Sequence, residues 1–306
     1  MIDNGIIHAE SPYYENSIFG KGHNWYRGNL HMHTTASDGH RSEFSALRTY
    51  QQKGYDFVAV TDHRIVSHNG FFKNMRVLSG VEYDLEYHGA CWHILGIGCI
   101  GHHVDKNYDP KFVTPMDVMK AIRADGGIPV IAHPAWSCMN PNDIACVEGP
   151  YFTEAYNSVS RMPYNGNFGD SSLYLDMWGR MGYNVIAFGD DDTHYYDQDL
   201  FGAQTFVRAD ECSFNCITDN LYEGNCYATT GPYIFDVTKD GDTFTAYVDS
   251  RAKYVIFNTA KIYDENRCQS YNENGNTYTV TPEDKYIRIE VINEDGTKAT
   301  TNVIRL

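Results

Sequence analysis

The sequence lacks any run of lysine or arginine. It holds 24 Lys and Arg residues against 40 Asp and Glu residues, which gives a formal net charge of −16. A surface this acidic repels the backbone of nucleic acids and anionic membranes. We therefore expect neither a nucleic-acid polymer nor a membrane as a partner. A phosphate group could still bind wherever bound cations reverse the local charge.

Three further features are missing from the chain as given. None of the eight cysteines forms a CxxC pair, which indicates free buried thiols in a reducing compartment rather than a zinc or disulfide framework. The first 25 residues contain neither the basic nor the apolar region of a signal peptide. No stretch approaches the roughly 20 apolar residues of a membrane span. These absences predict a cytoplasmic protein.

Short apolar runs alternate with helical patterns from about residue 28 to residue 230. The runs at 56–62 (DFVAVTD), 128–134 (IPVIAHP) and 183–190 (YNVIAFGD) are nearly continuous in apolar residues, as strands buried on both faces are. Stretches with helical periodicity lie between them. This succession predicts an α/β fold with a mostly parallel sheet or barrel.

The helical stretches carry boundary signals and apolar faces. The stretch that starts at Ser42 would place Phe44, Leu47 and Tyr50 on one face. The stretch that starts at Thr114 has the Thr-Pro signature of a helix start. In the third stretch, apolar residues recur four apart at Leu173, Met177 and Met181.

The pattern changes after residue 230. Residues 233–250 form two alternating runs about a Lys-Asp-Gly-Asp turn, which is a strong hairpin signal, and alternating runs continue to the C-terminus without a helical pattern. We expect two domains, a larger one over 1–230 and a small antiparallel, sandwich-like β module over 231–306. The aromatic residues of this module could stack on carbohydrate, but packing in its own core accounts for them better.

Histidines and carboxylates gather where the predicted strands end. His31 and His33 are two apart, so an extended strand would turn both imidazoles to one side, and Asp38 follows in a Ser-Asp-Gly turn. Because the carboxyl ends of strands in parallel sheets and barrels meet, we expect a metal site there. His93 would need a hairpin that returns from Glu82. The other candidates at strand ends are Asp62, His63, Glu82, His133, Asp192 and His194.

In this order, the pieces HxH with SDG, TDH, GVE, a lone histidine, AHP and DxH resemble the PHP (polymerase and histidinol phosphatase) family over roughly residues 28–230. The resemblance implies a distorted (β/α)7 TIM-like barrel that holds two or three divalent ions, usually manganese, zinc or iron. It implies that His31, His33 and Asp192 bind one ion together with Glu82, which bridges to a second ion.

The same resemblance implies ligands for the other ions. His93 and His133 would hold the second ion, and Asp38, His63 and His194 would hold a third. All nine positions carry residues of the right type, which implies an intact catalyst.

One motif departs from the family pattern. The common form is Gly-Ser-Asp-Ala-His, whereas residues 189–194 of this chain read Gly-Asp-Asp-Asp-Thr-His and contain one extra residue. Counting back from the histidine makes Asp192 the ligand, but Asp191 could take its place. Glu154 ends another apolar run and could orient a ligating histidine.

Substrate-binding residues are less well marked. Arg64 follows the TDH motif directly, and Arg161 follows a segment that resembles one near the family's pocket. Arginine binds phosphate in a bidentate way, although either residue could instead cap a loop or pair with one of the many carboxylates. His68 is a weaker candidate. His102 and His103 would lie in a loop, either solvated or placed over the site.

Nitrogen and oxygen ligands suit manganese, zinc or ferrous ions in open sites, and paired cations bring the pKa of a bridging water towards ~7. We therefore expect hydrolysis of a small phosphomonoester or phosphodiester by a metal-bound hydroxide, with Glu82, Asp192 and His194 as catalytic residues. His194 could donate a proton only if it is not fully committed to a metal. The alternatives are an amidohydrolase-like hydrolase of C–N bonds and a metal-stabilised carbohydrate-binding protein.

Overall fold

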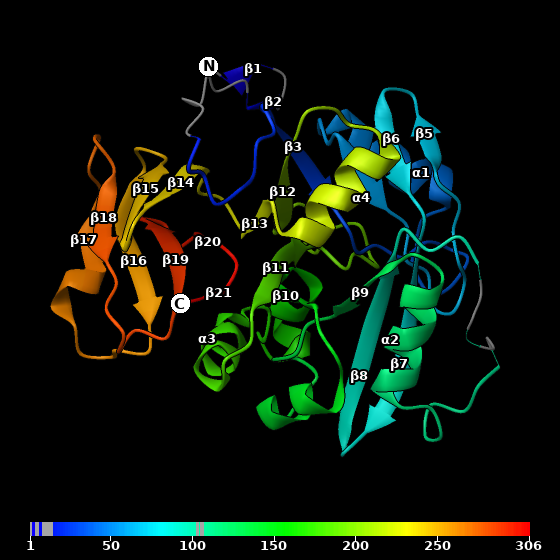
Figure 1. Ribbon diagram of the computed structural model, residues 1–306. Helices are drawn as coiled ribbons and strands as arrows, with labels where there is room; N and C mark the ends of the chain where they lie inside the picture. The colour runs from blue at the N-terminus through cyan, green and yellow to red at the C-terminus, as the bar shows by residue number, and fades with distance from the viewer. Residues whose placement is uncertain (1, 4–5, 8–14, 102–103, 105–106) are drawn as a thin grey trace.

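Figure 1 shows a computed structural model of the chain, which describes residues 2–3, 6–7, 15–101, 104 and 107–306. His102 and His103, which were expected in a loop, lie outside the described residues. The described part contains three sheets and four α-helices, so the expected mixed α/β fold is confirmed.

Two sheets carry the residues of the candidate site. Strands β3 (Asn24–Asn29), β4 (Phe57–Ala59) and β6 (Met75–Leu78) of the first sheet are parallel. Strands β9 (Ile128–Ile131), β10 (Tyr151–Asn157) and β11 (Val185–Asp190) of the second sheet are also parallel. The first sheet has the order β13 (Cys226–Thr229), β12 (Gln204–Ala209), β3 (Asn24–Asn29), β4 (Phe57–Ala59), β6 (Met75–Leu78) and β5 (Gly70–Phe72). The second has the order β11 (Val185–Asp190), β10 (Tyr151–Asn157), β9 (Ile128–Ile131), β8 (Ala90–Ile97) and β7 (Gly80–Tyr87). Two short strands pair with each other beside β3, namely β1 (Ile2–Asp3) and β2 (Ile6–Ile7).

The predicted distorted (β/α)7 TIM-like barrel is not confirmed. In the described residues the two ladders stay separate, and β7 and β8 form a long antiparallel hairpin. Strand β11 lies beside β12, but the two strands form no backbone ladder. They are joined instead through the Thr205 hydroxyl, which accepts a hydrogen bond from the Gly189 amide and donates one to the Gly189 carbonyl. The hairpin that was expected to bring His93 back to Glu82 is confirmed, since His93 pairs with Asp84.

The helix at Thr114 begins where its Thr-Pro signal predicted. The Thr114 and Asp117 side chains each accept a hydrogen bond from the other residue's backbone at the start of one helix, and the Ser42 side chain caps another. No helix in the described part of the chain is both long and apolar enough to cross a membrane. The four helices are α1 (Glu43–Gln52), α2 (Pro115–Ala124), α3 (Ser172–Met181) and α4 (Phe214–Glu223). The 3-10 turns are η1 (Pro141–Cys146), η2 (Val159–Arg161), η3 (Pro163–Asn165) and η4 (Glu265–Arg267).

Two predicted apolar faces are wrong in part. Phe44 is 66% exposed, while its predicted companions on α1 are buried. Leu173 and Met181 of α3 are also exposed, because this helix turns Leu175 and Trp178 towards β10 and β11. Spacing of four cannot identify the buried face when both faces carry apolar residues.

The C-terminal segment forms the expected antiparallel strands and continues the first sheet. Strand β20 pairs with β13, with Thr300 opposite Ala228, so the ladder runs on without interruption (Figure 1). The domain boundary at residue 230 stays a prediction. The hairpin β14 (Ile234–Asp240) and β15 (Thr243–Val248) forms the third sheet together with β18 (Asn276–Thr279). The strands that extend the first sheet are β16 (Ala252–Thr259), β17 (Cys268–Ser270), β19 (Tyr286–Asn293), β20 (Lys298–Thr300) and β21 (Ile304–Arg305).

Candidate metal centre

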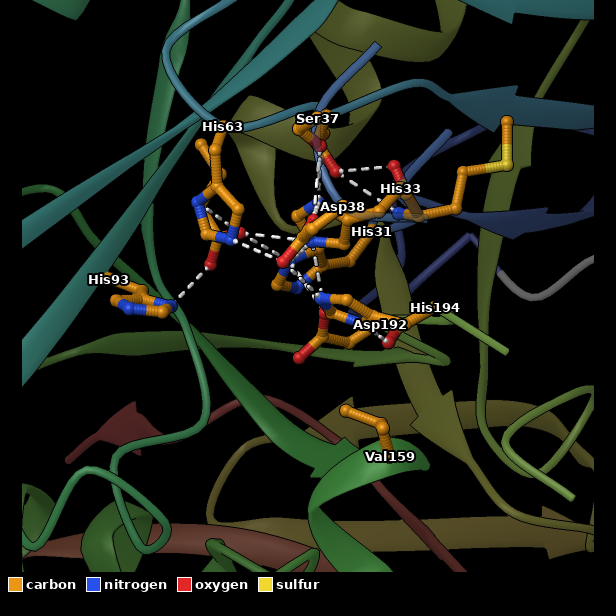
Figure 2. Close-up of polar contacts among 12 residues, drawn as sticks. His31, His33, Ser37, Asp38, His63, His93, Val159, Asp192 and His194 are labelled. Atoms are coloured by element: carbon orange, nitrogen blue, oxygen red, sulfur yellow. Dashed lines mark hydrogen bonds and ion pairs between the residues drawn. The ribbon is translucent and has the colours of Figure 1, made fainter. Parts of the chain in front are cut away.

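The segments that follow the parallel strands, together with the hairpin of β7 and β8, bring all nine predicted ligands into one cluster. Figure 2 labels all of them except Glu82 and His133. The donor atoms of the nine residues fall into three overlapping groups, and within each group the atoms lie within 4.8 Å of one another. The first group is His31, His33, Glu82 and Asp192. The second is Glu82, His93 and His133. The third is His33, Asp38, His63 and His194.

The first group is buried almost completely. Glu82 Oε2 lies 3.2 Å from His31 Nε2 and 3.0 Å from His33 Nε2. Asp192 Oδ1 lies 3.1 Å from each of the same two nitrogens. Two imidazole nitrogens and two carboxylate oxygens therefore face one point, which is a donor set that a divalent ion accepts.

Glu82 is shared by the first and second groups. Its Oε1 lies 2.8 Å from His93 Nδ1 and 3.7 Å from His133 Nε2, while its Oε2 serves the first group. Glu82 Oε1 and Asp192 Oδ1 are buried and make no hydrogen bond of acceptable geometry within the described residues. A divalent ion bound between these side chains would satisfy both oxygens.

His33 also belongs to the third group, for which the family resemblance implied only Asp38, His63 and His194. The Nε2 of His33 faces Glu82 and Asp192, and its Nδ1 lies 3.4 Å from Asp38 Oδ1. Asp38 Oδ2 lies 3.4 Å from His194 Nε2 and 3.7 Å from His63 Nε2. This group is more open than the first, since the Asp38 side chain is half-exposed.

Backbone geometry turns two ligands inward just after their strands end. His133 has φ 30° and Asp192 has φ 53°, which lie in the left-handed region that non-glycine residues seldom adopt. The amide of Asp192 donates to the carbonyl of His31, and the amide of His33 donates to the carbonyl of Thr193. The two ligand-bearing segments are thus bonded to each other at the cluster.

Polar side chains around the ligands fix their orientation. Glu154 Oε1 lies 2.7 Å from His31 Nδ1, and its Oε2 accepts from the His133 amide. Asn157 Nδ2 donates both to Glu154 and to Asp192 Oδ2. Glu154 therefore has the orienting position expected from the sequence. Asn157 was missed, although it follows Glu154 by three residues and is the last residue of the same strand.

Two further residues support the cluster: Asp62, which was a candidate at a strand end but belongs to none of the three ligand groups, and Cys91, which went unassigned. Asp62 accepts hydrogen bonds from the backbone and hydroxyl groups of Thr34 and Ser37, so it holds the loop that carries Asp38. Cys91 Sγ lies 3.4 Å from His93 Nε2, which leaves Nδ1 directed at Glu82. The position of Asp62 directly before His63 was a usable signal.

The electrostatics of the cluster favour its charged forms. Burial lowers the pKa of His31, but the carboxylates of Asp192, Glu82 and Glu154 raise it well above its ordinary value. Burial likewise lowers the pKa of His194, but the carboxylates of Asp38 and Asp192 raise it to about 9. Burial raises the pKa of Glu82, and the neighbouring histidines bring it well below its usual range. An ion that binds here must displace the protons of these histidines.

The choice between Asp191 and Asp192 is decided by geometry. The Asp191 carboxylate accepts hydrogen bonds from three successive backbone amides at 201–203, from the Tyr50 hydroxyl and from the Ser158 hydroxyl. It therefore points away from the cluster. Asp192 supplies the oxygen that faces the histidines.

The predicted substrate-binding residues lie elsewhere. Arg64 binds both carboxylate oxygens of Asp84, at 2.7 and 2.6 Å, and its guanidinium stacks 4.3 Å from the Tyr108 ring centre. Arg161 lines a neighbouring cavity of about 300 Å³, together with Lys298 and other residues. His68 is exposed. Within the described residues, none of these three lines the cavity over the cluster.

The cavity over the cluster has a volume of about 270 Å³. Its floor is made of ligands from all three groups, and the 3-10 turn η2 forms one wall, from which Val159 projects beside Asp192 and His194 in Figure 2. The remaining lining residues are Trp136, Ser160, Tyr164, Asn165 and Tyr195.

Comparison with solved structures identifies the architecture. A two-domain protein from Bacteroides vulgatus ATCC 8482 that contains a predicted PHP-like metal-dependent phosphoesterase matches 91% of this chain and 95% of its own, with 17% identity and a TM-score of 0.52. The fold is PHP-like.

Sequence comparisons reach less far. No family model matches this chain. The DNA polymerase/3′-5′ exonuclease PolX of Bacillus subtilis (strain 168) is 34% identical over 79 residues, which is 19% of this chain and 14% of PolX. The chain thus spans only a small part of this curated relative. An amidohydrolase from Chromobacterium violaceum, with sulfate bound and no metal, matches 56% of this chain and 89% of its own at 17% identity, with a TM-score of only 0.40.

Proposed function

We propose that this protein is a metal-dependent hydrolase of small phosphomonoesters or phosphodiesters. The observation that carries the proposal is the set of three adjoining ligand groups, joined by Glu82 and His33, on the floor of one small cavity. The PHP-like fold supports it, because the similar protein from B. vulgatus contains a predicted metal-dependent phosphoesterase. Ligand groups that share side chains are suited to ions held close together.

The donor set fits two or three divalent ions such as manganese, zinc or iron. Imidazole and carboxylate ligands suit all three metals, and Glu82 has one oxygen for each of two adjacent groups. When bound, the ions would supply the positive charge that a phosphoryl group requires and would activate water as the nucleophile. Glu154 and Asn157 would keep the histidines and Asp192 in the ligating orientation.

His194 can act either as a ligand or as a proton donor. Its Nδ1 lies 2.9 Å from the backbone carbonyl oxygen of Asp192, which fixes the proton on Nδ1. Only Nε2, which faces Asp38, remains for either role. A third ion would occupy Nε2, whereas with two ions this atom could hold the proton that the leaving alkoxide needs.

The test is an assay of protein stripped of metal and reloaded with manganese, zinc or ferrous ion. A panel of phosphomonoesters, phosphodiesters and amides is measured beside metal content by elemental analysis. We expect two or three ions per chain and turnover of a phosphoester. His33→Ala should lose at least about 100-fold in kcat, the upper figure for residues that only support ligands, since His33 itself serves two ligand groups.

His68→Ala is the matched control, because His68 is exposed and lies outside the cavity lining. It should keep wild-type activity. Full activity in His33→Ala would remove the assigned site from the reaction. Hydrolysis of amides without any phosphoester turnover would replace the proposal with the amidohydrolase alternative.

A further inference from the structure

The cavity over the metal cluster has an unusual balance of charge. Of the described residues that line it, none is lysine or arginine. Arg64 is bound by Asp84, and Arg161 faces the neighbouring cavity. Among the described residues, the cavity lining therefore offers the substrate no lysine or arginine, and bound ions would carry the recognition of the phosphoryl group there. Recognition of the rest of the substrate must come from other side chains.

Aromatic rings make up much of the remaining lining. The Trp136 ring packs edge-on against the His133 ring, with centroids 4.8 Å apart. Tyr195 follows His194 directly, and its ring meets that of Tyr164 edge-on at 5.9 Å. The rings thus stand beside the histidines of the second and third ligand groups.

The two tyrosines are exposed to an extent that packing does not explain. Tyr164 is 64% exposed and Tyr195 is 51% exposed, although both border a cavity. Trp136 is partly buried, whereas the other three tryptophans are fully buried. Solvent-exposed aromatic rings at a cavity mouth can stack against a planar ring of a ligand, and this interaction requires no charged side chain.

We infer that the substrate's leaving group carries a planar aromatic ring, as a nucleoside does, and that Tyr164, Tyr195 and Trp136 bind it. This inference rests on the proposed phosphoesterase function and narrows its substrate class. The cavity of about 270 Å³ lies just below the usual range of roughly 300–1,000 Å³ for small-molecule sites, so it suits one phosphoryl group with one ring system rather than a polymer.

The decisive comparison uses two esters with the same scissile bond. Adenosine 5′-monophosphate and ribose 5-phosphate both release a primary sugar alkoxide, and they differ in the base. Stacking of one base is worth about 1–3 kcal/mol, so kcat/KM should be about 5- to 150-fold higher for the nucleotide. Equal kcat/KM for the two esters in the wild-type protein would overturn the inference while leaving the proposed function intact.

Variants assign the preference to the rings. Tyr164→Ala and Tyr195→Ala should each lower the ratio of the two kcat/KM values, and the double variant should bring it towards one. Tyr164→Phe and Tyr195→Phe keep the ring and should keep the ratio. Tyr263→Ala is the control, since Tyr263 is 96% exposed on the C-terminal module. A ratio unchanged in the double alanine variant would overturn the assignment.

A binding measurement separates failure of the inference from failure of the proposed function. Trp136 is the tryptophan that borders the cavity, so titration with adenosine should quench its fluorescence in the wild-type protein and not in Trp136→Phe. If no ester is hydrolysed with any metal, the proposed function fails, and quenching by adenosine still supports the ring site. Absence of quenching in the wild-type protein would overturn it.

Discussion

Three consecutive aspartates after β11 show how environment assigns different roles to the same side chain. Asp190 Oδ1 accepts from the Leu30 amide at 2.6 Å, and burial, followed by the nearby Glu154, raises its pKa well above the ordinary value. Asp191 anchors the loop at 201–203. Only Asp192 turns towards the ligand histidines, through its left-handed backbone. Two adjacent residues of the same type thus have different roles: Asp192 faces the histidines, and Asp191 holds a loop.

Substitution of the neighbouring aspartates should therefore give opposite results. Asp191→Ala leaves three backbone amides and two hydroxyls without their acceptor, and we expect a loss of about 2–4 kcal/mol in the free energy of unfolding. Asp192→Asn should instead lower metal content and activity with a smaller effect on the stability of the metal-free protein. Urea denaturation and elemental analysis measure both. Loss of metal in the Asp191 variant alone would reverse the assignment.

At the scale of elements, helix α3 joins the two parts of the chain through one face. Trp178 is fully buried, and its indole N–H donates to the carbonyl of Pro141. The same helix contacts β10, β11 and β19. Leu173 lies on the opposite face of the helix and is 61% exposed.

Two substitutions on this helix should separate the faces. Trp178→Ala should lower the free energy of unfolding by about 3–5 kcal/mol, because it empties a packed site and leaves the Pro141 carbonyl without its donor. Leu173→Ala should change it by less than about 0.5 kcal/mol. The midpoints of urea unfolding measure the difference. Equal losses would show that the exposed face is also packed.

The turn between β18 and β19 depends on a buried carboxylate. Asp284 accepts hydrogen bonds from the Thr281 amide and hydroxyl and from the Tyr278 hydroxyl. Burial raises the pKa of Asp284, but these donors bring it below its ordinary value. A carboxyl with a lowered folded-state pKa stabilises the protein above its unfolded pKa of about 3.9, and this contribution is lost as the pH falls through the folded value.

Asp284→Asn should consequently cost about 1–2 kcal/mol of unfolding free energy at pH 7, and the difference from wild type should shrink as the pH falls from 5 to 3. Asp240→Asn, at an exposed carboxylate of the neighbouring hairpin, serves as the control. Chemical denaturation at each pH gives the measurement. A difference that grows in acid would contradict the lowered pKa.

At the scale of the whole molecule, the C-terminal strands are bonded into the site-bearing part. Besides the ladder of β13 and β20, Arg288 of β19 is fully buried and binds both carboxylate oxygens of Asp176 on α3, at 3.1 and 2.7 Å. Lys298 of β20 also pairs with Asp170 at 2.7 Å. Each of these two basic side chains of the C-terminal strands thus pairs with a carboxylate of the first 230 residues.

We expect the whole molecule to unfold in one cooperative transition. Tryptophan fluorescence reports on the first 230 residues, which contain all four tryptophans, and far-ultraviolet circular dichroism reports on all strands. The two transitions should coincide in urea. Asp176→Ala leaves the buried Arg288 without its main partner and should cost about 3 kcal/mol. Two separated transitions in the wild-type protein would contradict this coupling.

Much of the site followed from local patterns in the chain. His31, His33, His63, His133 and their carboxylate partners stand at strand ends, and strand ends can be read from apolar runs of a few residues. The hairpin that carries His93 and the capped start of α2 were predictable for the same reason. The binding of metal by these residues stays a prediction until metal content is measured.

The order and chemical type of the nine candidate ligands were determined by the sequence alone, because each depends on its immediate neighbours. Only the tertiary structure decided that Asp192 rather than Asp191 faces the cluster, that Arg64 pairs with Asp84, and that tyrosines rather than arginines line the cavity. It also decided that the sheets do not close into one ladder. These outcomes depend on contacts between segments far apart in the chain, and such contacts exist only after the segments pack together.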